Sequence, residues 1–307
     1  MSTNSKIYEV ITSKVVSQIE EAIKTGEHFT WTKSWKGMPL GNFISYQGKN
    51  FKEYRGINRL LLDNGLYITY NQLQEYASKH PEKSFKVKKG SKKHTVYFYK
   101  ISEYKDKDEN GEEIVKVYPL MRFYGVFNIK DIEGLDDYNP VPEYHYDETE
   151  LSLKADELIK EFCEKDGLTL NIVKGSDRCF YRPSTHEVCV PEKSAFTSLE
   201  EYYAAVFHEL VHATSKYLKR DIAGHCFGSK DYSFEELVAE LGSCFLMQSL
   251  GFETTNTFKN STAYLQGWLS AIKENDVSFI VKASNQAQKA ADYFFGVSFE
   301  ESDNEAA

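Results

Sequence analysis

Apolar residues recur at helical spacing near the start of the chain. Ile7, Ile11 and Val15 are four residues apart, and this period predicts an amphipathic helix over residues 4–25. The following stretch, residues 27–58, contains tryptophan, proline and glycine without any period, so we expect it to be irregular.

The remainder of the first 135 residues predicts short helices and a β-hairpin. Asn110-Gly111 is a strong two-residue turn signal, so the charged segment Lys105–Glu113 is expected to form the tip of the hairpin. A second, lysine-rich turn is expected at Lys88–Lys93. The helices expected from the apolar period are 59–63 and 69–80, and the expected strands are 85–88, 95–104 and 115–128.

An acidic segment with two prolines and no periodicity, Asp136–Glu143, predicts a boundary, and we assign residues 136–150 to a linker. After it, helical and strand patterns alternate. Ser198 and Glu201 form a capping box at the start of a long helix. The expected helices are 151–166, 198–220, 234–249, 261–273 and 277–295, and the expected strands are 168–173, 178–182 and 187–190.

This order of elements predicts an α+β protein with two domains. Residues 1–135 are expected to form a mixed α/β domain, residues 151–300 a second domain, and residues 301–307 a frayed tail. No apolar run approaches the roughly 18 residues of a membrane span. The first residues lack the layout of a secretory signal, so a cytoplasmic location is expected.

Charge is divided unequally between the two halves. The whole chain carries a net charge of −9, but residues 1–135 hold 22 Lys and Arg against 16 Asp and Glu. Within residues 31–100 the imbalance grows to 14 basic against 4 acidic residues. Such asymmetry predicts a basic binding module joined to an acidic module of another kind.

A candidate metal motif, His208-Glu209-Leu210-Val211-His212, lies inside the long capped helix. Residues four apart share one helix face, so both imidazoles can reach one ion, and Glu209 can act on a water molecule beside that ion as a general base. The simpler alternative is a pair of ordinary helix histidines without a metal. The motif favours a site for one Zn²⁺ ion.

A third ligand is expected from the next helix, where Glu235, Glu236 and Glu240 follow Phe234. The spacing resembles that of thermolysin-like zincins, which implies Glu236 as the ligand and Glu240 as the acceptor of a hydrogen bond from a ligating histidine. A solvated acidic face is the alternative for this segment. We further expect the strand 187–190 to be the sheet edge that holds an extended peptide, and His186 and His225 to be ordinary loop residues.

Aromatic and basic residues alternate in the first half of the chain. Bases of a single strand stack on aromatic rings while its phosphates contact cations, so this mixture is compatible with single-stranded DNA binding. The alternative is that the rings are core residues and the lysines are merely solvated. The candidate DNA-binding residues are Trp31, Trp35, Lys49, Lys52, Tyr54, Arg55, Arg59, Lys88, Lys89, Lys92 and Lys93.

Longer motifs follow one another over nearly the whole chain: Trp31-x-x-x-Trp35, Pro39-x-Gly41-Asn42, Tyr54–Asn58, Tyr124–Leu135, Phe207–His212, Phe234–Glu240, Tyr264–Leu269 and Ala287–Asp292. In this order they resemble the ArdC antirestriction family of conjugative plasmids, phages and other mobile elements. The resemblance implies an N-terminal single-stranded-DNA-binding domain, a C-terminal zincin-like metallopeptidase domain and protection of incoming DNA from restriction. Only the segment Lys105–Glu113 looks inserted, and it lies in no motif.

Three functions remain open at the level of sequence. The first is an antirestriction protein that binds single-stranded DNA and cleaves a host protein as a zinc peptidase. The second is a DNA-binding antirestriction factor whose zincin domain is only structural, and an intact Glu209 counts against it. The third is a DNA-dependent protease that degrades DNA-bound proteins.

Overall fold

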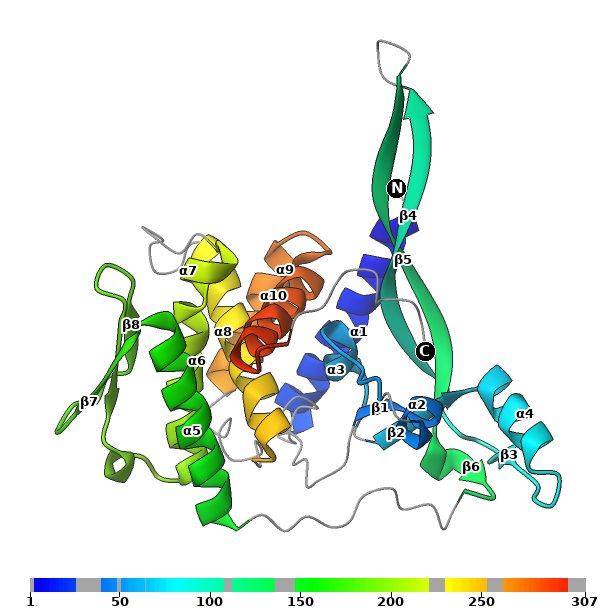
Figure 1. The fold of residues 1–307 in the computed structure, drawn as a ribbon, viewed down its shortest axis with the longest axis horizontal. Helices are drawn as coiled ribbons and strands as arrows, with labels where there is room; N and C mark the ends of the chain where they lie inside the picture. Colours follow the sequence, from blue (N-terminus) through cyan, green and yellow to red (C-terminus); the bar gives the residue numbers. More distant parts are fainter. Residues whose placement is uncertain are drawn as a thin grey trace. The chain divides into compact units, whose positions relative to one another are not determined.

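The computed structural model describes residues 3–25, 40–48, 51–63, 65–107, 112–135, 147–220, 230–252 and 262–297. By their contacts these residues form two compact units (Figure 1). Within the described ranges, the first unit comprises residues 3–7 and 40–135, and the second comprises residues 8–25 and 147–297.

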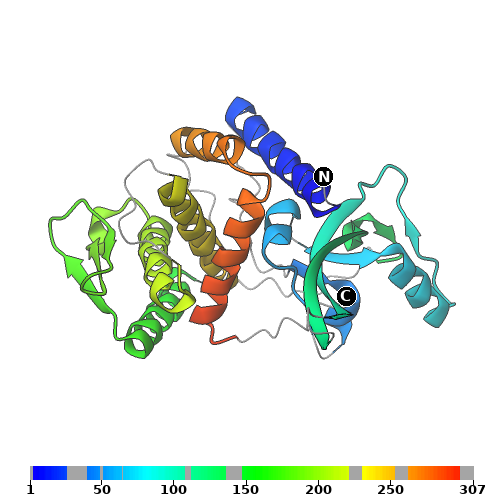
Figure 2. The same ribbon diagram turned by 90° about the horizontal axis from the view of Figure 1, so that it is seen from above.

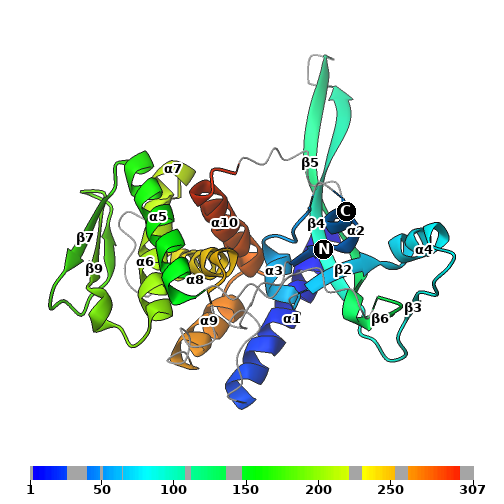
Figure 3. The same cartoon turned by 60° about the horizontal axis from the view of Figure 1, so that its bottom comes forward.

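The first unit is built on a four-stranded sheet in the order β1-β2-β5-β4. β1 and β2 are parallel, and the other neighbours are antiparallel. Only residues 126–128 of β5 pair with β2, so most of the β4–β5 hairpin is a two-stranded ribbon (Figure 3). The strands are β1 (Leu40–Asn42), β2 (Gly65–Thr69), β4 (His94–Lys107) and β5 (Glu113–Asn128), and a separate pair consists of β3 (Lys86–Val87) and β6 (Ile132–Glu133).

Short helices with side-chain caps connect these strands. Asn42 accepts hydrogen bonds from the backbone of Ile44 and Ser45, and Thr69 forms a capping box with Gln72. The helices of this unit are α2 (Phe43–Gln47), α3 (Ile57–Leu61) and α4 (Tyr70–Lys79), together with the 3₁₀ turn Ile129–Asp131. β1 and α2 lie inside the stretch that we expected to be irregular, because a three-residue strand and a five-residue helix are too short to show a period.

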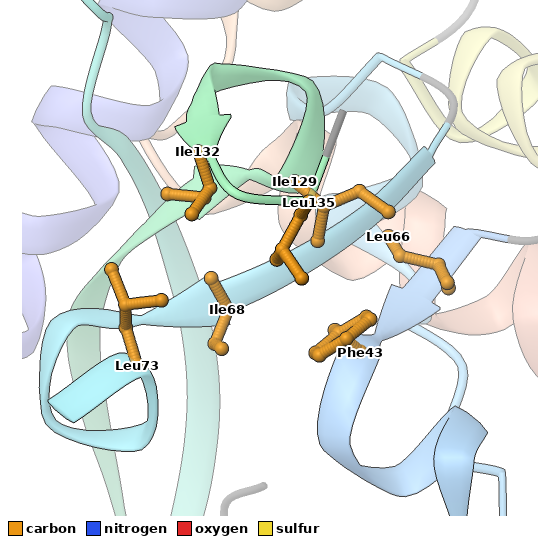
Figure 4. Packing of buried hydrophobic residues seen from close by; sticks show 7 residues of the cluster. All are labelled: Phe43, Leu66, Ile68, Leu73, Ile129, Ile132 and Leu135. Carbon is orange, nitrogen blue, oxygen red and sulfur yellow. The ribbon is translucent and has the colours of Figure 1, made fainter. Parts of the chain in front are cut away.

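One apolar cluster of the first unit lies between the β2 strand and its covering segments (Figure 4). Leu66 and Ile68 alternate along β2 and point to the same side, where α2 and α4 contribute one apolar side chain each. The cluster consists of Phe43, Leu66, Ile68, Leu73, Ile129, Ile132 and Leu135.

The second unit combines a three-stranded sheet with helices. The strand order is β7-β9-β8, in which β9 is parallel to β7 and antiparallel to β8. The strands are β7 (Thr169–Val173), β8 (Phe180–Arg182) and β9 (Glu187–Pro191), with a 3₁₀ turn at Lys193–Ala195. The helices are α5 (Glu148–Asp166), α6 (Leu199–Ala213), α7 (Ser215–Leu218), α8 (Lys230–Leu250), α9 (Thr262–Glu274) and α10 (Phe279–Phe294) (Figure 2).

The N-terminal helix α1 (Thr3–Thr25) departs from the expected domain boundary, because from residue 8 onward it belongs to the second unit. Ile11, Val15 and Ile19 on its apolar face are buried. Thr12 donates a 2.8 Å hydrogen bond to the carbonyl of Val277, and Lys273 forms a 2.7 Å ion pair with Glu20. An amphipathic pattern predicts a buried face but does not reveal which unit covers it.

Two other boundaries differ from the sequence expectation. The long helix that begins after Ser198 ends at Ala213, and Thr214 separates it from α7. α5 begins at Glu148, capped by Asp147, so it takes up residues that we assigned to the linker. Residues 136–146 lie outside the described ranges. No helix of the described ranges is long and apolar enough to span a bilayer.

Candidate metal centre

His208 and His212 lie one turn apart on α6, and their rings meet edge to face. Their Nε2 atoms are 3.2 Å apart, and the two rings are inclined at 79°. Two nitrogens bound at about 2.0–2.1 Å to one ion with tetrahedral angles would be about 3.4 Å apart. The pair is therefore arranged as two ligands of a single ion would be.

The third donor comes from α8, which packs closely against α6. Gly242 of α8 lies against Val211 of α6, where a Cβ atom at position 242 would be 2.8 Å from the valine side chain. This close approach allows the start of α8 to come near the histidines. The carboxylate of Glu236 lies 3.5 Å from Nε2 of His208 and 3.5 Å from Nε2 of His212.

Donor atoms of His208, His212 and Glu236 all lie within 4.8 Å of one another, and this is the only such cluster of metal-binding side chains in the described ranges. Two imidazoles and a carboxylate are a donor set that suits zinc and leaves one coordination position open. The three residues singled out from the sequence are thus brought together, and they fit a divalent metal.

The carboxylates control the charge of the imidazoles. Burial alone would lower the pKa of His208, but its contact with Glu236 and the charge of Glu240 raise that pKa above its usual value. Burial also opposes protonation of His212, yet hydrogen bonds to Glu235 and Glu236 raise its pKa to about 10. The same contacts outweigh the effect of burial on Glu236 and hold its pKa well below the usual range.

Glu235 and Arg220 also belong to the site, although the sequence predicts no role for either. Glu235 Oε1 is 3.1 Å from Nδ1 of His212, and the guanidinium of Arg220 donates 2.9 Å hydrogen bonds to both oxygens of Glu235. Glu240, which we expected to accept a hydrogen bond from a ligating histidine, lies 3.7 Å from Nδ1 of His208, beyond hydrogen-bond distance. Burial raises the pKa of Glu240 above its usual value.

Glu209 directly follows His208 on α6 and is almost fully buried, with 9% of its surface exposed. Its charge acts on the thiol of Cys179, whose pKa is raised to about 11 chiefly by burial and then by Glu209. Cys179 directly precedes β8, and α6 packs against β8 and β9. Glu209 therefore lies on the side of α6 that faces these strands.

The prediction that residues 187–190 form the edge strand that holds a peptide is wrong. β9, which contains residues 187–190, is the central strand of its sheet, with β7 and β8 at the edges. Sequence order does not fix spatial order, and the hairpin connection places β8 beside β9 as an edge strand. His186 bonds to Tyr181 at 2.9 Å and lies outside the metal cluster, whereas His225 is outside the described ranges.

The candidate DNA-binding residues divide into three groups. Trp31, Trp35 and Lys49 are outside the described ranges. Tyr54 was expected to stack on bases but is a buried residue with 7% exposure, which also raises the pKa of its hydroxyl. Its assignment is corrected, because an aromatic residue in a basic stretch can equally fill the core.

The lysine turn and its neighbours remain accessible to different degrees. Lys89, Lys92 and Lys93 are exposed, whereas Lys88 is half-buried and donates a 2.8 Å hydrogen bond to the carbonyl of Lys130. The remaining residues of the candidate set are Lys52, which is exposed, and Arg55 and Arg59, which are half-buried.

The family models divide the chain into two parts as the structure does, except that the first model also includes residues 8–25 of α1, which contact the second unit. Residues 5–127 match the N-terminal domain of the anti-restriction factor ArdC, and residues 157–286 match a zincin-like metallopeptidase. Together the matches confirm the expected fold class, a two-domain α+β protein.

Related proteins extend over almost the whole chain. "DNA primase TraC" of Escherichia coli is 29% identical over 95% of this chain, although the chain spans only 20% of that primase. An uncharacterized protein of Sinorhizobium fredii, y4eC, is 29% identical, and the match covers 95% of this chain and 92% of y4eC.

The crystal structure of antirestriction ArdC from the R388 plasmid, in its metal-free form, is 30% identical and superposes with a TM-score of 0.64, covering 98% of this chain and 99% of that one. Its Mn(II)-bound form gives a TM-score of 0.61 at 29% identity, covering 97% of this chain and 99% of that one. Sequence and fold agree over both domains, and the chain belongs to the ArdC antirestriction family.

Proposed function

We propose that the second unit is a zinc-dependent peptidase. The observation that carries this proposal is the convergence of His208, His212 and Glu236 within 4.8 Å, with Glu209 beside them on the same helix as the histidines. The Mn(II)-bound crystal structure of R388 ArdC supports a divalent metal in this family. Zinc is our assignment, one ion per chain, because imidazole and carboxylate donors with an open position are typical of catalytic zinc.

The metal, when bound, would supply Lewis acidity that acidifies a water molecule and polarises a peptide carbonyl. Glu209 would accept the proton of that water and return it to the amine that leaves when the peptide bond breaks. Its burial restricts bulk water near the carboxylate. β8, the edge strand beside α6, is the strand against which an extended peptide would align.

Single-stranded DNA binding is proposed for the first unit. The lysine turn favours it, because Lys89, Lys92 and Lys93 are exposed together on one short connection. They belong to the 31–100 segment, with its 14 basic against 4 acidic residues. Relatives that are DNA primases contain a region similar to nearly this whole chain, which supports a role on DNA. Affinity of this kind should fall steeply with salt, since bound phosphates release counterions.

In combination, the two proposals describe the chain as an antirestriction protein that binds entering single-stranded DNA and cleaves a host protein. Its test is incubation of the purified zinc-loaded protein with candidate host proteins, with and without single-stranded DNA, followed by mass spectrometry of the products. Glu209→Gln and a chelator-treated sample are the controls. Cleavage of restriction enzymes supports this function, whereas cleavage of other DNA-bound proteins only when DNA is present favours a DNA-dependent protease.

A non-catalytic role for the zinc domain is the remaining alternative. It would be supported if no substrate is cut while the Glu209→Gln variant still protects a plasmid during transfer into a restricting host. The buried Glu209 next to the histidine pair favours the catalytic alternative, because a purely structural metal site needs no general base.

A further inference from the structure

Arg220 and Glu235 form a buried ion pair directly behind His212. Their side chains are only 6% and 8% exposed, and the guanidinium donates to both carboxylate oxygens at 2.9 Å. Buried charges are costly unless they are paired and fully hydrogen-bonded, so this pair is a defined part of the structure rather than a solvated contact. Glu235 Oε1 also contacts Nδ1 of His212 at 3.1 Å.

The rest of the guanidinium is fixed to the end of α6. It donates a 2.7 Å hydrogen bond to the carbonyl of Val211 and a 2.9 Å bond to Oγ1 of Thr214. Lys219 adopts a left-handed conformation, with φ +53°, at the end of α7, where the chain turns before Arg220. Arg220 thus joins the helix that carries the histidines to the helix that carries the glutamates.

Glu235 and Glu236 are consecutive on α8, and both contact His212. Both oxygens of Glu235 accept hydrogen bonds from Arg220, whereas the oxygens of Glu236 face the Nε2 atoms of the two histidines. Bidentate arginine contacts hold a carboxylate in one orientation. Arg220 therefore holds the carboxylate of Glu235 away from the place where a metal would bind, whereas the adjacent Glu236 faces that place.

Charge balance supports the same arrangement. The charges of four carboxylates act on the histidine pair, and a divalent ion would neutralise only two of them. The guanidinium of Arg220 offsets a third. The four carboxylates are Glu209, Glu235, Glu236 and Glu240.

We propose that Arg220 and Glu235 are positioning residues of the metal centre. Glu235 accepts the Nδ1–H of His212 and so directs Nε2 toward the ion, while Arg220 keeps Glu235 from becoming a ligand in place of Glu236. The inference rests on the metal site proposed above. Among the described residues His208 has no equivalent support, because Glu240 is 3.7 Å from its Nδ1.

The test compares zinc affinity in the full-length protein, measured by competition with a chromophoric chelator. Glu235→Gln keeps the shape of the side chain but removes its charge, and Arg220→Lys keeps a charge but loses the bidentate geometry. We expect each to lower zinc affinity by about 10–100-fold. Glu240→Gln is the matched control on the same helix and should lower it by less than about tenfold. Glu235→Asp retains a carboxylate and should recover part of the affinity.

A spectroscopic measurement separates positioning from general destabilisation. In the zinc-loaded wild type, ¹H–¹⁵N correlation spectra should show a slowly exchanging, downfield Nδ1–H of His212, and this signal should shift or vanish in Glu235→Gln. Wild-type affinity and an unchanged signal in both Glu235→Gln and Arg220→Lys would overturn the inference. Failure of the wild type itself to bind zinc would instead refute the proposed metal site and the inference with it.

Discussion

Asn58 and Tyr97 are joined by two buried hydrogen bonds, although 39 residues separate them in the chain. Nδ2 of Asn58 donates to the carbonyl of Tyr97 at 2.6 Å, and Oδ1 accepts from the Tyr97 amide at 2.8 Å. The amide side chain thereby takes the place of a neighbouring strand at the edge of β4. The motif Tyr54–Asn58 is consequently a structural element that ties α3 to the sheet.

Removal of this pairing should destabilise the first unit. Asn58→Ala leaves a buried amide and carbonyl without partners, which should cost about 1–3 kcal/mol. Urea unfolding together with hydrogen exchange at the Tyr97 amide measures the effect. Asn58→Asp keeps the acceptor but places a buried carboxylate oxygen against the Tyr97 carbonyl, so this variant should be at least as unstable as the alanine variant. An unchanged exchange rate in the alanine variant would contradict this account.

Removal of a ligand should empty the metal site. His208→Ala, His212→Ala and Glu236→Ala each delete one of three converging donors, so metal content measured by elemental analysis should fall from one ion per chain to a small fraction. Circular dichroism confirms that the variants fold. Full metal content in Glu236→Ala would show that Glu235 or Glu240 is the ligand instead.

Glu209→Gln should separate chemistry from binding. Glutamine is nearly isosteric with glutamate but cannot accept a proton from water, so peptide cleavage should fall by at least about 10²–10⁴-fold. Zinc content and DNA affinity should be retained, because Glu209 is not among the converging donors. Plasmid transfer into a restricting host then decides whether protection requires the peptidase. We expect protection to be lost, and full protection would show that cleavage is dispensable.

The stabilising effect of zinc should increase with pH. The pKa of His212 is raised to about 10 in the protein without metal, above the ordinary value of 6.5. Its protonated form therefore stabilises the metal-free fold fully below pH 6.5, and this contribution is lost as the pH rises toward 10. Zinc requires the unprotonated nitrogen, so metal binding displaces that proton.

Thermal unfolding with and without saturating zinc, at about pH 6.5, the lower end of the window between the two pKa values, and at about pH 9, well inside that window, measures this dependence. The gain in Tm on zinc addition should be larger at the higher pH. Equal gains at the two pH values would mean that His212 binds no proton in the metal-free protein.

Neutralising the lysine turn should weaken binding to single-stranded DNA without unfolding the protein. Alanine at Lys89, Lys92 and Lys93 removes three exposed charges, and the salt-dependence slope should decrease by about 0.7 for every phosphate that is no longer neutralised. Tyr54→Phe is the control, because a buried tyrosine ring does not stack on bases and its replacement should leave DNA affinity unchanged. An unaltered slope in the triple variant would place the DNA-binding surface elsewhere.

Part of the metal centre could be predicted from the sequence, because the geometry of a helix is local. Residues 208 and 212 share a face of any helix, so their convergence follows from spacing alone. The zincin-like spacing also predicts Glu236 as the ligand, whereas the role of Glu235 depends on how α8 is rotated against α6, and that rotation is set by tertiary packing at Gly242 and by Arg220. A strand such as β9 could likewise be located, but its central position depends on pairing that the local pattern does not contain.

The edge strand β8 has only three residues, Phe180–Arg182. A peptide aligned on so short an edge would gain few backbone hydrogen bonds, so its intrinsic affinity would be low. A peptidase with that limitation depends on local concentration rather than on tight substrate recognition. If the first unit binds DNA as proposed, its covalent linkage to the peptidase would raise the effective concentration of proteins bound to the same strand, toward the millimolar range typical of short tethers. Target choice would then be decided by which proteins share the DNA, and free copies of the same proteins would escape cleavage.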